Sequence, residues 1–329
     1  MLNYGKRVKQ QIAQFADLGA LWRPGTITQY WMMHHIVPRM DEVFGVKGVF
    51  DVYTAALAEC VRKAAAAGRT ARFVSIGSGD CQVEIRQAQR LKAKTGGAFV
   101  IVATDISDIR LDRAKQAAAE AGVGEHFEFL TIDFNDFRFD RQYDAFLAHH
   151  ILHHIVNLEG LFETIHESMH EDSLFMTNDL IGRNGHQRWP ETLEWIESIW
   201  PTLPSHYRFN YQFNAIHEKY LDWDCAKTGF EGIRAQDILP LLVQRFGFDG
   251  FVGYGGIVDP FVERGYGRNL VADRPEDCAF IDHVEKLNQT LLESGHIKPT
   301  QMLAVMRRSG GAGKTYHGLT PEKAVRKTS

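Results

Sequence analysis

Glycines and acids stand at the ends of short apolar runs, an arrangement that suits the binding of a small ligand. The run "FVSI" leads into Gly77 and Gly79, "VAT" leads into Asp105, and "TI" leads into Asp133. A glycine allows a tight turn and lets a ligand approach the backbone without a Cβ in the way. Carboxylates accept hydrogen bonds, so Asp105 suits two ribose hydroxyls and Asp133 suits an adenine amine. The pattern predicts a site for a nucleoside with free hydroxyls.

The residues after the glycines indicate what this nucleoside carries. Asp80 is expected to open a helix, where a dinucleotide's pyrophosphate would bind to free N–H groups at the positive end of the helix dipole. A carboxylate there repels phosphate and tolerates a cationic ligand. Gln82 stands where a third glycine would complete a G-x-G-x-x-G motif. We therefore expect S-adenosylmethionine and not a nicotinamide dinucleotide. The alternative is that Asp80 only caps its helix and Asp133 only begins a turn.

Four histidines in "AHHILHHI" follow the next apolar run. Histidine has an unperturbed pKa of about 6.5, which suits a base at neutral pH, and a hydroxyl acceptor needs a base most. If a helix begins here, His149 pairs with His153 and His150 with His154 at i,i+4. We predict His153, then His150, as the base or an orienting group, with His186 in a later loop as a rival. A packed core histidine is the alternative for each, and the favoured reading for His154.

Two further groups of residues are weighed against simpler explanations. Paired i,i+4 histidines can bind a metal, but no carboxylate or cysteine lies at helix spacing to complete the shell, so we predict no metal. In "TQYWMMHHIVP", Tyr30 is a candidate cofactor contact, and His34 or His35 a candidate acceptor contact. An amphipathic packing helix is the simpler explanation of that stretch.

A parallel sheet is needed to bring these residues together. Short apolar strands alternate with helices, which predicts an α/β fold with helices on both faces of the sheet. Ligands bind such sheets at the carboxyl ends of the strands, where the glycines, acids and histidines fall. The strands are expected near 72–76, 99–104, 127–132, 143–148, 173–178 and 250–255, and the helices near 80–94, 107–121, 157–170, 235–246 and 276–294.

Changes in composition divide the chain into segments. The stretch "HQRWPETLEWIESIWPTLPSHYRFNYQF" is too apolar for a loose linker and predicts an inserted cap, whereas "SGGAGKTYHGLTPEKAVRKTS" has few apolar residues and predicts a disordered tail. The expected segments are an N-terminal helical cap or lid (1–68), the S-adenosylmethionine-binding core (69–181), a helical and aromatic substrate cap (182–234), the C-terminal part of the core with a helical insertion (235–308) and the tail (309–329).

The core region resembles a known family. "VSIGSGDC" is similar to the glycine-rich motif of class I S-adenosylmethionine-dependent methyltransferases, "VATDIS" to their acidic ribose-binding motif, and "YDAFLAHHILHHIVNLEGLFETIHESMHEDSLFMTND" to their fourth strand, helix and fifth strand. The resemblance implies a Rossmann-like sheet of seven mostly parallel strands, with "QMLAVMRR" as the last, antiparallel strand. Ser75 stands where the family usually has an acid and Cys81 where it often has a glycine. Loss of the acid could loosen the grip on the methionyl amine.

The resemblance also implies where the cofactor and the acceptor lie. Residue 149 would offer backbone to the methionyl end, while residues 150 and 153 would face the acceptor. The expected cofactor-binding residues are Ser75, Gly77, Ser78, Gly79, Asp105, Ile106, Asp133, Phe134, His149 and Tyr30.

Composition limits the partners. A net charge of −4 gives no large positive field for gripping a phosphate backbone, so general nucleic-acid binding is disfavoured. No run approaches the length of a membrane span, and the N-terminus carries no convincing targeting segment, so we expect a cytoplasmic protein without a membrane partner. A homodimer is left open. The cysteines, which lie far apart and suit reduced thiols, are Cys60, Cys81, Cys225 and Cys278.

Together these features predict an enzyme, a methyltransferase that methylates an oxygen of a small-molecule acceptor with a histidine base. The alternative, motivated by Ser75 and the unusual cap, is a protein of the same fold that binds S-adenosylmethionine without transferring its methyl group, as a binding module or a catalyst of a rearrangement. A nicotinamide dehydrogenase is disfavoured by Asp80 and Gln82.

Overall fold

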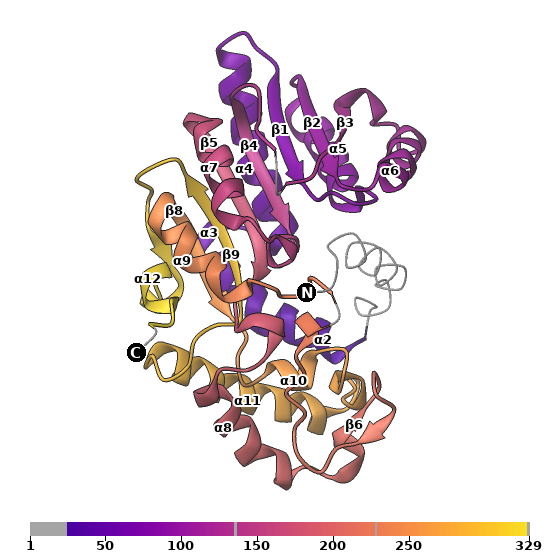
Figure 1. The fold of residues 1–329 in the computed structure, drawn as a ribbon, viewed down its shortest axis with the longest axis vertical. Coiled ribbons are helices and arrows are strands. Elements are labelled where there is room, and N and C mark those ends of the chain that lie inside the picture. The colour runs from indigo at the N-terminus through magenta and orange to yellow at the C-terminus, as the bar shows by residue number, and fades with distance from the viewer. Residues whose placement is uncertain (1–24, 135–136, 228, 328–329) are drawn as a thin grey trace.

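A sheet flanked by helices makes up most of the molecule, and a smaller, mainly helical lobe packs at one end of it (Figure 1). The structure is a computed structural model that describes residues 25–134, 137–227 and 229–327. Residues 1–24 of the predicted N-terminal cap (1–68) therefore lie outside the described residues, as do 135–136, 228 and 328–329.

Eight strands form one mixed sheet in the order β10-β8-β9-β5-β4-β1-β2-β3. Strands β3, β2, β1, β4 and β5 run parallel to one another, while β9 runs antiparallel to both β5 and β8. The α/β, mostly parallel fold is confirmed, and β10 adds an eighth strand to the seven expected. The bounds are β1 Ala71–Ile76, β2 Phe99–Asp105, β3 Phe127–Thr131, β4 Tyr143–His149, β5 Met169–Leu180, β8 Gly247–Tyr254, β9 Gln301–Arg307 and β10 Lys314–Thr315.

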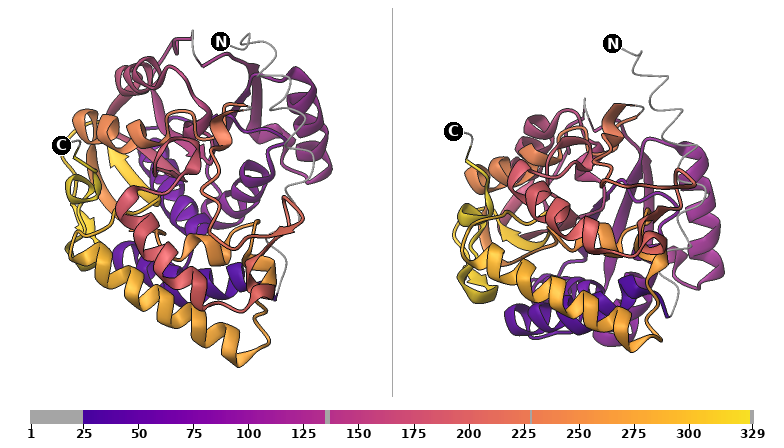
Figure 2. Two further views of the ribbon diagram at one scale, coloured as in Figure 1. Left: turned by 60° about the horizontal axis from the view of Figure 1, so that its bottom comes forward. Right: turned by 90° about the horizontal axis from the view of Figure 1, so that it is seen from below.

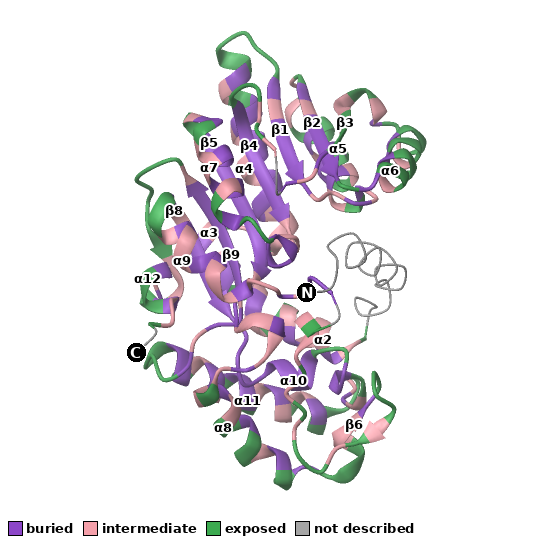
Figure 3. Ribbon diagram, viewed as in Figure 1, coloured by how far each residue is buried: buried purple, intermediate pink, exposed green. Residues whose placement is uncertain are grey.

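The central strands are apolar because both faces of the sheet are covered. All residues of β1 except Arg72 are buried, and Figure 3 shows the central strands as buried along most of their length. Register decides where these strands end: Ile76 lies opposite Thr104 on one side and Ala148 on the other. The glycine loop, Asp105 and the histidines therefore leave the sheet at one edge, as predicted.

Helices cover the two faces. In Figure 1, α4 lies behind the sheet, where it packs on α5 and on β1, β4 and β5, while α7 and α9 pack together in front. Helix α4 falls within the segment predicted as a cap, yet it belongs to the core because Tyr53, Leu57 and Val61 bury its apolar face against the sheet. The bounds are α4 Val49–Ala66, α5 Gln82–Thr95, α6 Asp108–Glu120, α7 Leu158–Glu167 and α9 Ala235–Arg245.

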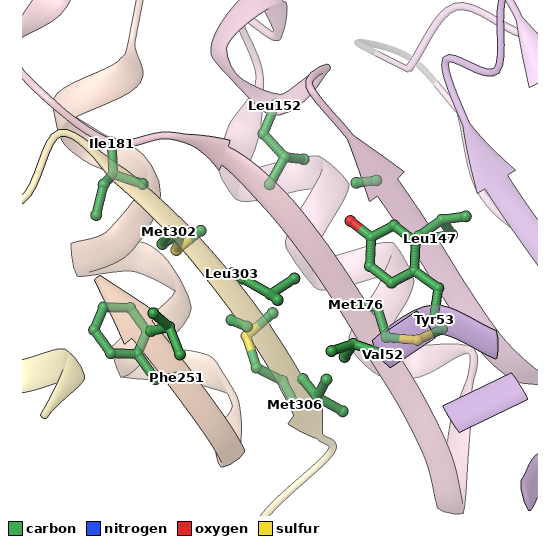
Figure 4. Packing of buried hydrophobic residues seen from close by; sticks show 14 of the residues in the cluster. Val52, Tyr53, Leu147, Leu152, Met176, Ile181, Phe251, Met302, Leu303 and Met306 are labelled. Atoms are coloured by element: carbon green, nitrogen blue, oxygen red, sulfur yellow. The ribbon is translucent and has the colours of Figure 1, made fainter. Parts of the chain in front are cut away.

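The antiparallel strand β9 lies in the middle of the hydrophobic core. Met302, Leu303 and Met306 of β9 are fully buried. Figure 4 shows them beside Met176 of β5, with Tyr53 of α4 packed against the neighbouring strands. The C-terminal "QMLAVMRR" is therefore an essential part of the sheet.

The second lobe combines residues from three distant parts of the chain (Figure 2). Arg39 pairs with Glu285, which also accepts a hydrogen bond from Trp31 Nε1 at 2.8 Å. Arg188 donates to Asp259 at 3.1 Å. The elements are α2 Ile27–Trp31, a π-helical turn Met32–Ile36, α8 Pro190–Ile199, the hairpin of β6 Phe209–Asn210 and β7 Ala215–Ile216, α10 Asp259–Val262 and α11 Pro275–Glu293. Helix α3 Val37–Phe44 continues from the turn and packs on β8 and α4 of the larger part of the molecule.

The C-terminal segment is ordered, which corrects the prediction of a disordered tail. Thr315 of β10 pairs in parallel with Phe251 of β8, and helix α12 Pro321–Ala324 follows. Leu319 and Ala324 are buried. The segment has few apolar residues, but these few face the edge of the sheet beside β8. The average composition of the segment therefore does not reveal that some of its residues are buried.

Two expectations about the whole chain can be compared with the structure. All four cysteines are free thiols, as expected. Within the described residues, none of the helices combines the length and apolar character needed to cross a membrane.

Candidate active site

The glycine loop after β1 is shaped by close neighbours. Gly77 and Gly79 have φ of +62° and +54°, a conformation that favours glycine. A Cβ on Gly77 would lie 2.3 Å from Ile151 Cγ1, and one on Gly79 would lie 2.1 Å from Arg110 Nη2. The backbone conformation therefore favours glycine at both positions, and the Ile151 side chain leaves little room for a Cβ at Gly77, whereas the Arg110 guanidinium beside Gly79 ends a flexible side chain. The Ser78 N–H donates to Thr104 O at 2.8 Å and joins the loop to β2.

Asp105 connects the end of β2 to this loop. It accepts hydrogen bonds from the Gly79 N–H and the Ser107 N–H, both at 2.9 Å, and is 5% exposed. Each carboxylate oxygen keeps a second lone pair, so the side chain is fixed while it can still accept from a ribose. The neighbouring Ile106 is exposed.

The end of β3 lies beside the end of β2, because the Ile132 N–H donates to Asp105 O at 2.9 Å. Asp133 follows directly, and Phe134 is buried. The structure thus brings Gly77, Gly79, Asp105 and Asp133 to one edge. Their contact with the cofactor stays a prediction.

Asp80 does not open the helix, contrary to the prediction. Cys81 has φ of 57°, a left-handed conformation that cannot continue a helix, so α5 begins at Gln82. The Asp80 carboxylate instead lies 3.7 Å from the guanidinium of Arg110. This pairing offsets the negative charge that was expected to repel phosphate. Asp80 therefore disfavours a dinucleotide less than the sequence analysis predicts.

A buried carboxyl lies beside Ser75, the position where the family usually has an acid. Glu84, on the first turn of α5, is 4% exposed and accepts a hydrogen bond from Ser75 Oγ at 2.6 Å. Burial raises the pKa of Glu84 to about 7, although the Ser75 hydroxyl opposes this. An acid is therefore absent at position 75 of β1 but present beside it on α5, and the sequence analysis missed this residue.

The histidines after β4 form a tight turn, not the start of a helix. His150 has φ of +50°, and only residues Leu152–His154 make a 3-10 turn. The predicted i,i+4 pairs do not form. His149 lies instead with its Nδ1 3.2 Å from the Tyr53 hydroxyl, and burial lowers its pKa to about 3. His149 is therefore a neutral, packed residue.

His150 is held by Asn178 of β5, and Asn178 is in turn held by Tyr254 of β8. The Tyr254 hydroxyl donates to Asn178 Oδ1 at 2.7 Å, so the Asn178 amide N–H donates to His150 Nε2 at 3.0 Å. Burial lowers the pKa of His150. With Nε2 accepting, the proton of the neutral ring is on Nδ1. His150 is therefore suited to orient an acceptor by donating a hydrogen bond, and less to removing a proton.

His153 is surrounded by two carboxylates. Its Nδ1–H donates to Asp179 Oδ1 at 2.5 Å, and its Nε2 lies 3.6 Å from Glu231 Oε1. Burial alone disfavours the charged ring, but the charge and hydrogen bond of Asp179, aided by Glu231, outweigh it and raise the pKa of His153 to about 9. The same interactions hold the pKa values of Asp179 and Glu231 well below their usual range. At neutral pH His153 carries a proton and is not a free base.

His186 joins this group from the inserted segment. Its Nε2–H donates to Glu231 Oε1 at 2.9 Å, and burial lowers its pKa despite that carboxylate. The backbone supports the contact, because the Gly185 N–H donates to Gly232 O at 2.8 Å. His154 Nε2 lies 3.9 Å from Glu231 Oε2, and burial lowers the pKa of His154 to about 3. We call His150, His153 and His186, with Asp179 and Glu231, the histidine cluster.

The predicted N-terminal contacts lie elsewhere. The Tyr30 hydroxyl is 3.1 Å and 3.2 Å from the two carboxylate oxygens of Asp282 on α11, and His35 Nε2 is 2.8 Å from the same carboxylate. His34 stacks on Tyr30. These contacts favour the packing interpretation of the stretch over a role in the site.

Two members of the cluster were missed by the sequence analysis. Asp179 ends the run "FMTND", so the rule that ligands follow strand ends could have found it. Its Oδ2 accepts from the backbone N–H groups of Ile151 and Leu152 at 2.9 and 2.8 Å. Glu231 lies 78 residues after His153 with no strand pattern around it, so only the fold reveals it.

Comparison with known proteins identifies the core of the chain. Residues 73–172 match a family model described as "Methyltransferase domain". This match confirms the prediction: the core is a class I S-adenosylmethionine-dependent methyltransferase domain, the chain is a methyltransferase, and its cofactor is S-adenosylmethionine. The match includes the glycine loop, Asp105, Asp133 and the histidine turn, but it ends before Asp179, His186 and Glu231.

Similar solved structures include further methyltransferases and a cyclase. The O-methyltransferase of a trans-AT polyketide synthase from Brevibacillus brevis, in complex with S-adenosyl-L-homocysteine, has 16% identity and a TM-score of 0.44, over 92% of this chain and 86% of that one. Geranyl diphosphate C-methyltransferase from Streptomyces coelicolor has 14% identity and a TM-score of 0.42, over 77% and 76%. The [4+2]-cyclase SpnF has 12% identity and a TM-score of 0.42, over 87% and 96%. A comparison with curated proteins found no match. These likenesses do not define the acceptor of this chain.

Proposed function

We propose that the protein transfers the methyl group of S-adenosylmethionine to a hydroxyl oxygen of a small-molecule acceptor, and that the histidine cluster activates this hydroxyl. One observation carries the proposal: Ile151 packs on Gly77 of the glycine loop, and its own N–H donates to Asp179 of the cluster at 2.9 Å. A single residue therefore separates the predicted cofactor loop from the cluster.

The chemistry of the cluster favours an oxygen acceptor. The sulfonium is already a good leaving group, so the protein has to align the acceptor, exclude water and manage a proton. Proton management matters most for a hydroxyl, and it matters little for a neutral amine or a thiolate. Two carboxylates and three imidazoles converge here, with Asp179 fully buried. Because His153 already carries a proton at neutral pH, we assign the activation of the hydroxyl to the cluster as a unit, in which Asp179 and Glu231 flank His153.

The inserted segment supports a small acceptor. The Ile233 N–H donates to His153 O at 3.1 Å, so the loop that carries Glu231 is bonded directly to the histidine turn. A large polymer would have to displace this loop to reach His153, which is only 3% exposed. The net charge of −4 also disfavours a nucleic-acid acceptor.

Methyl transfer from radiolabelled S-adenosylmethionine to a panel of small hydroxyl compounds and extract fractions tests the proposal. We expect label in a methyl ether, together with one equivalent of S-adenosylhomocysteine. The variant Glu231→Gln should lose most of the transfer and keep cofactor affinity, whereas Asp105→Ala should lose cofactor affinity. Binding of S-adenosylhomocysteine without transfer to any fraction would contradict the proposal. A new product formed without S-adenosylhomocysteine would instead support a rearrangement catalyst.

A further inference from the structure

Three side chains of the cluster direct ligand atoms toward one point. One ring nitrogen each of His153 and His186 and a carboxylate oxygen of Glu231 all lie within 4.8 Å of one another, and the Nε2 atom of each ring faces Glu231. Among residues 25–134, 137–227 and 229–327, they are the one group of at least three His, Cys, Asp or Glu side chains arranged in this way. The three residues come from separate parts of the chain, so helix spacing, on which the prediction of no metal was based, could not reveal them.

The spacing of the three atoms suits a common ion. Two atoms that each lie about 2.1 Å from one ion at a tetrahedral angle are roughly 3.4 Å apart. Glu231 Oε1 is 3.6 Å from His153 Nε2 and 2.9 Å from His186 Nε2. Both distances to Glu231 are therefore within about 0.5 Å of the separation that a shared ion requires, and the two histidine ligand atoms lie no more than 4.8 Å apart.

A second carboxylate orients one of these ligands. Metal-binding histidines usually donate the N–H of their other ring nitrogen to a carboxylate or carbonyl, which fixes the ring and its tautomer. Asp179 takes this role for His153, because Oδ1 accepts from Nδ1 at 2.5 Å and Nε2 is left facing Glu231. An ion bound here replaces the Nε2 proton of His153, which is released, while neutral His186 carries its proton on Nδ1 in place of Nε2. Asp179 itself is held by the N–H groups of Ile151 and Leu152, so it is built to orient the ring.

The two loops of the inserted segment are fixed against each other. Gly185, His186 and Gly232 all have positive φ, between 56° and 67°. A Cβ on Gly232 would lie 2.9 Å from His186 Cε1, so only glycine lets the two loops approach this closely. The side chains of His186 and Glu231 keep 18% and 22% of their surface exposed, against 4% for His153. One side of the group is therefore open to a further ligand.

We propose that His153, His186 and Glu231 bind one divalent transition-metal ion, with Zn²⁺ the best match. Two imidazoles and one carboxylate with an open position form the ligand set of many catalytic zinc sites. A donor set without a thiolate and with only one carboxylate suits Zn²⁺ better than Ca²⁺ or Mg²⁺, which prefer oxygen ligands.

The site deepens the proposed function and rests on it for its role in catalysis. An acceptor hydroxyl at the open position becomes more acidic, and its proton passes to solvent. The oxygen's electron pair then forms the O–CH₃ bond as the C–S bond breaks, and that bond's electrons stay on sulfur to give S-adenosylhomocysteine. The ion is unchanged at the end of the reaction.

Metal binding is testable without the acceptor. The full-length protein, stripped with a chelator, is titrated with Zn²⁺ by calorimetry and with Co²⁺ by visible absorption, which reports tetrahedral coordination. We expect one ion per chain, and no such binding in His186→Ala or Glu231→Gln. The matched control His206→Ala removes a histidine of the same inserted segment outside the cluster. Asp179→Asn should weaken affinity by about 10- to 100-fold while leaving the stoichiometry unchanged.

The outcomes separate the ion from the methyl transfer. Failure of the wild-type protein to bind one equivalent, or equal binding by His186→Ala and Glu231→Gln, would overturn the site. Circular dichroism of both variants checks that they are folded, and both positions are partly exposed. Full methyl transfer by metal-free protein would overturn the ion's role and leave the proposed function standing. Stoichiometric binding without any methyl transfer would support the site and contradict the proposed function.

Discussion

Replacing Glu84 with glutamine removes a titratable group next to the glycine loop and keeps its shape. The Glu84 side chain is buried, and its partner is the Ser75 hydroxyl at 2.6 Å. Glutamine can accept the same hydrogen bond without ever carrying a charge. We predict that Glu84→Gln folds and is more stable than the wild-type protein at pH 8, with little difference at pH 4.5.

The size of the effect follows from the raised pKa. Burial brings the pKa of Glu84 to about 7, from an ordinary value of 4.5. Because the folded state binds this proton more tightly than the unfolded state, stability falls as pH rises between these two values. A pKa difference of one corresponds to about 1.4 kcal/mol, so a difference of about 2.5 corresponds to roughly 3 kcal/mol. The stability contributed by protonated Glu84 is complete below pH 4.5 and is lost above pH 7.

Urea unfolding at several pH values between 4.5 and 8 measures this contribution. The free energy of unfolding of Glu84→Gln, minus that of the wild-type protein, should increase by about 3 kcal/mol across the range. Glu120→Gln is the matched control, because Glu120 is exposed on α6. Its difference from wild type should stay level. Equal pH dependence in the Glu84 variant and the wild-type protein would refute the argument that this carboxyl is buried with a raised pKa.

The same variant tests whether Glu84 replaces the acid that the family has at position 75. A carboxylate that holds the methionyl amine makes a charge-assisted hydrogen bond, whose loss costs about 1.5–3 kcal/mol. Calorimetry at pH 8 should then show S-adenosylmethionine bound about 10- to 100-fold more weakly by Glu84→Gln. Unchanged affinity would limit Glu84 to a structural role beneath the loop.

Other perturbations test the loop, the second lobe and the C-terminal segment. Gly77→Ala should weaken S-adenosylhomocysteine binding, because its Cβ would lie 2.3 Å from a neighbouring side chain. Gly96→Ala is the control, since Gly96 has a similar φ and no atom within 4 Å of the added Cβ. This control should lose only about 1–2 kcal/mol of unfolding free energy, from backbone strain. Arg188→Met should destabilise the protein by about 3–5 kcal/mol in thermal unfolding, since it leaves the buried Asp259 without its cation; a loss below about 1 kcal/mol would show that the pair is not buried. Deleting 309–329 should lower the unfolding free energy by a few kcal/mol, because this segment buries apolar side chains beside β8; a transition identical to that of the full chain would restore the view of a disordered tail.

The parallel core could be predicted because its signals are local. A strand buried on both faces reads as an apolar run, and β1, β2 and β4 do so. The carboxyl ends of parallel strands meet at one edge of the sheet. The spacing of "FVSIGSGD", "VATD" and "TID" was therefore enough to place Gly77, Asp105 and Asp133 near one another.

Two predicted helix starts were wrong because one residue at each has a left-handed backbone conformation. A left-handed Cys81 delays the start of α5, and a left-handed His150 turns "HHILHH" into a tight turn. Neither cysteine nor histidine as a residue type predicts a left-handed conformation. The C-terminal segment was misjudged for a related reason, because composition averages over residues while burial depends on the few, such as Leu319, that face the core.

The class of this protein could be predicted from contiguous stretches of its sequence. Apolar strands, glycines and acids at their ends, and the resemblance they carry are properties of contiguous stretches, and they were enough to predict a methyltransferase core and its cofactor. The surroundings of His153, in contrast, become visible only in the folded chain. Asp179, His186 and Glu231 are 26, 33 and 78 residues away along the chain, and nothing local couples their positions. Their convergence depends on how β5 and the inserted loops pack, and the charge and chemistry of the site arise from that packing.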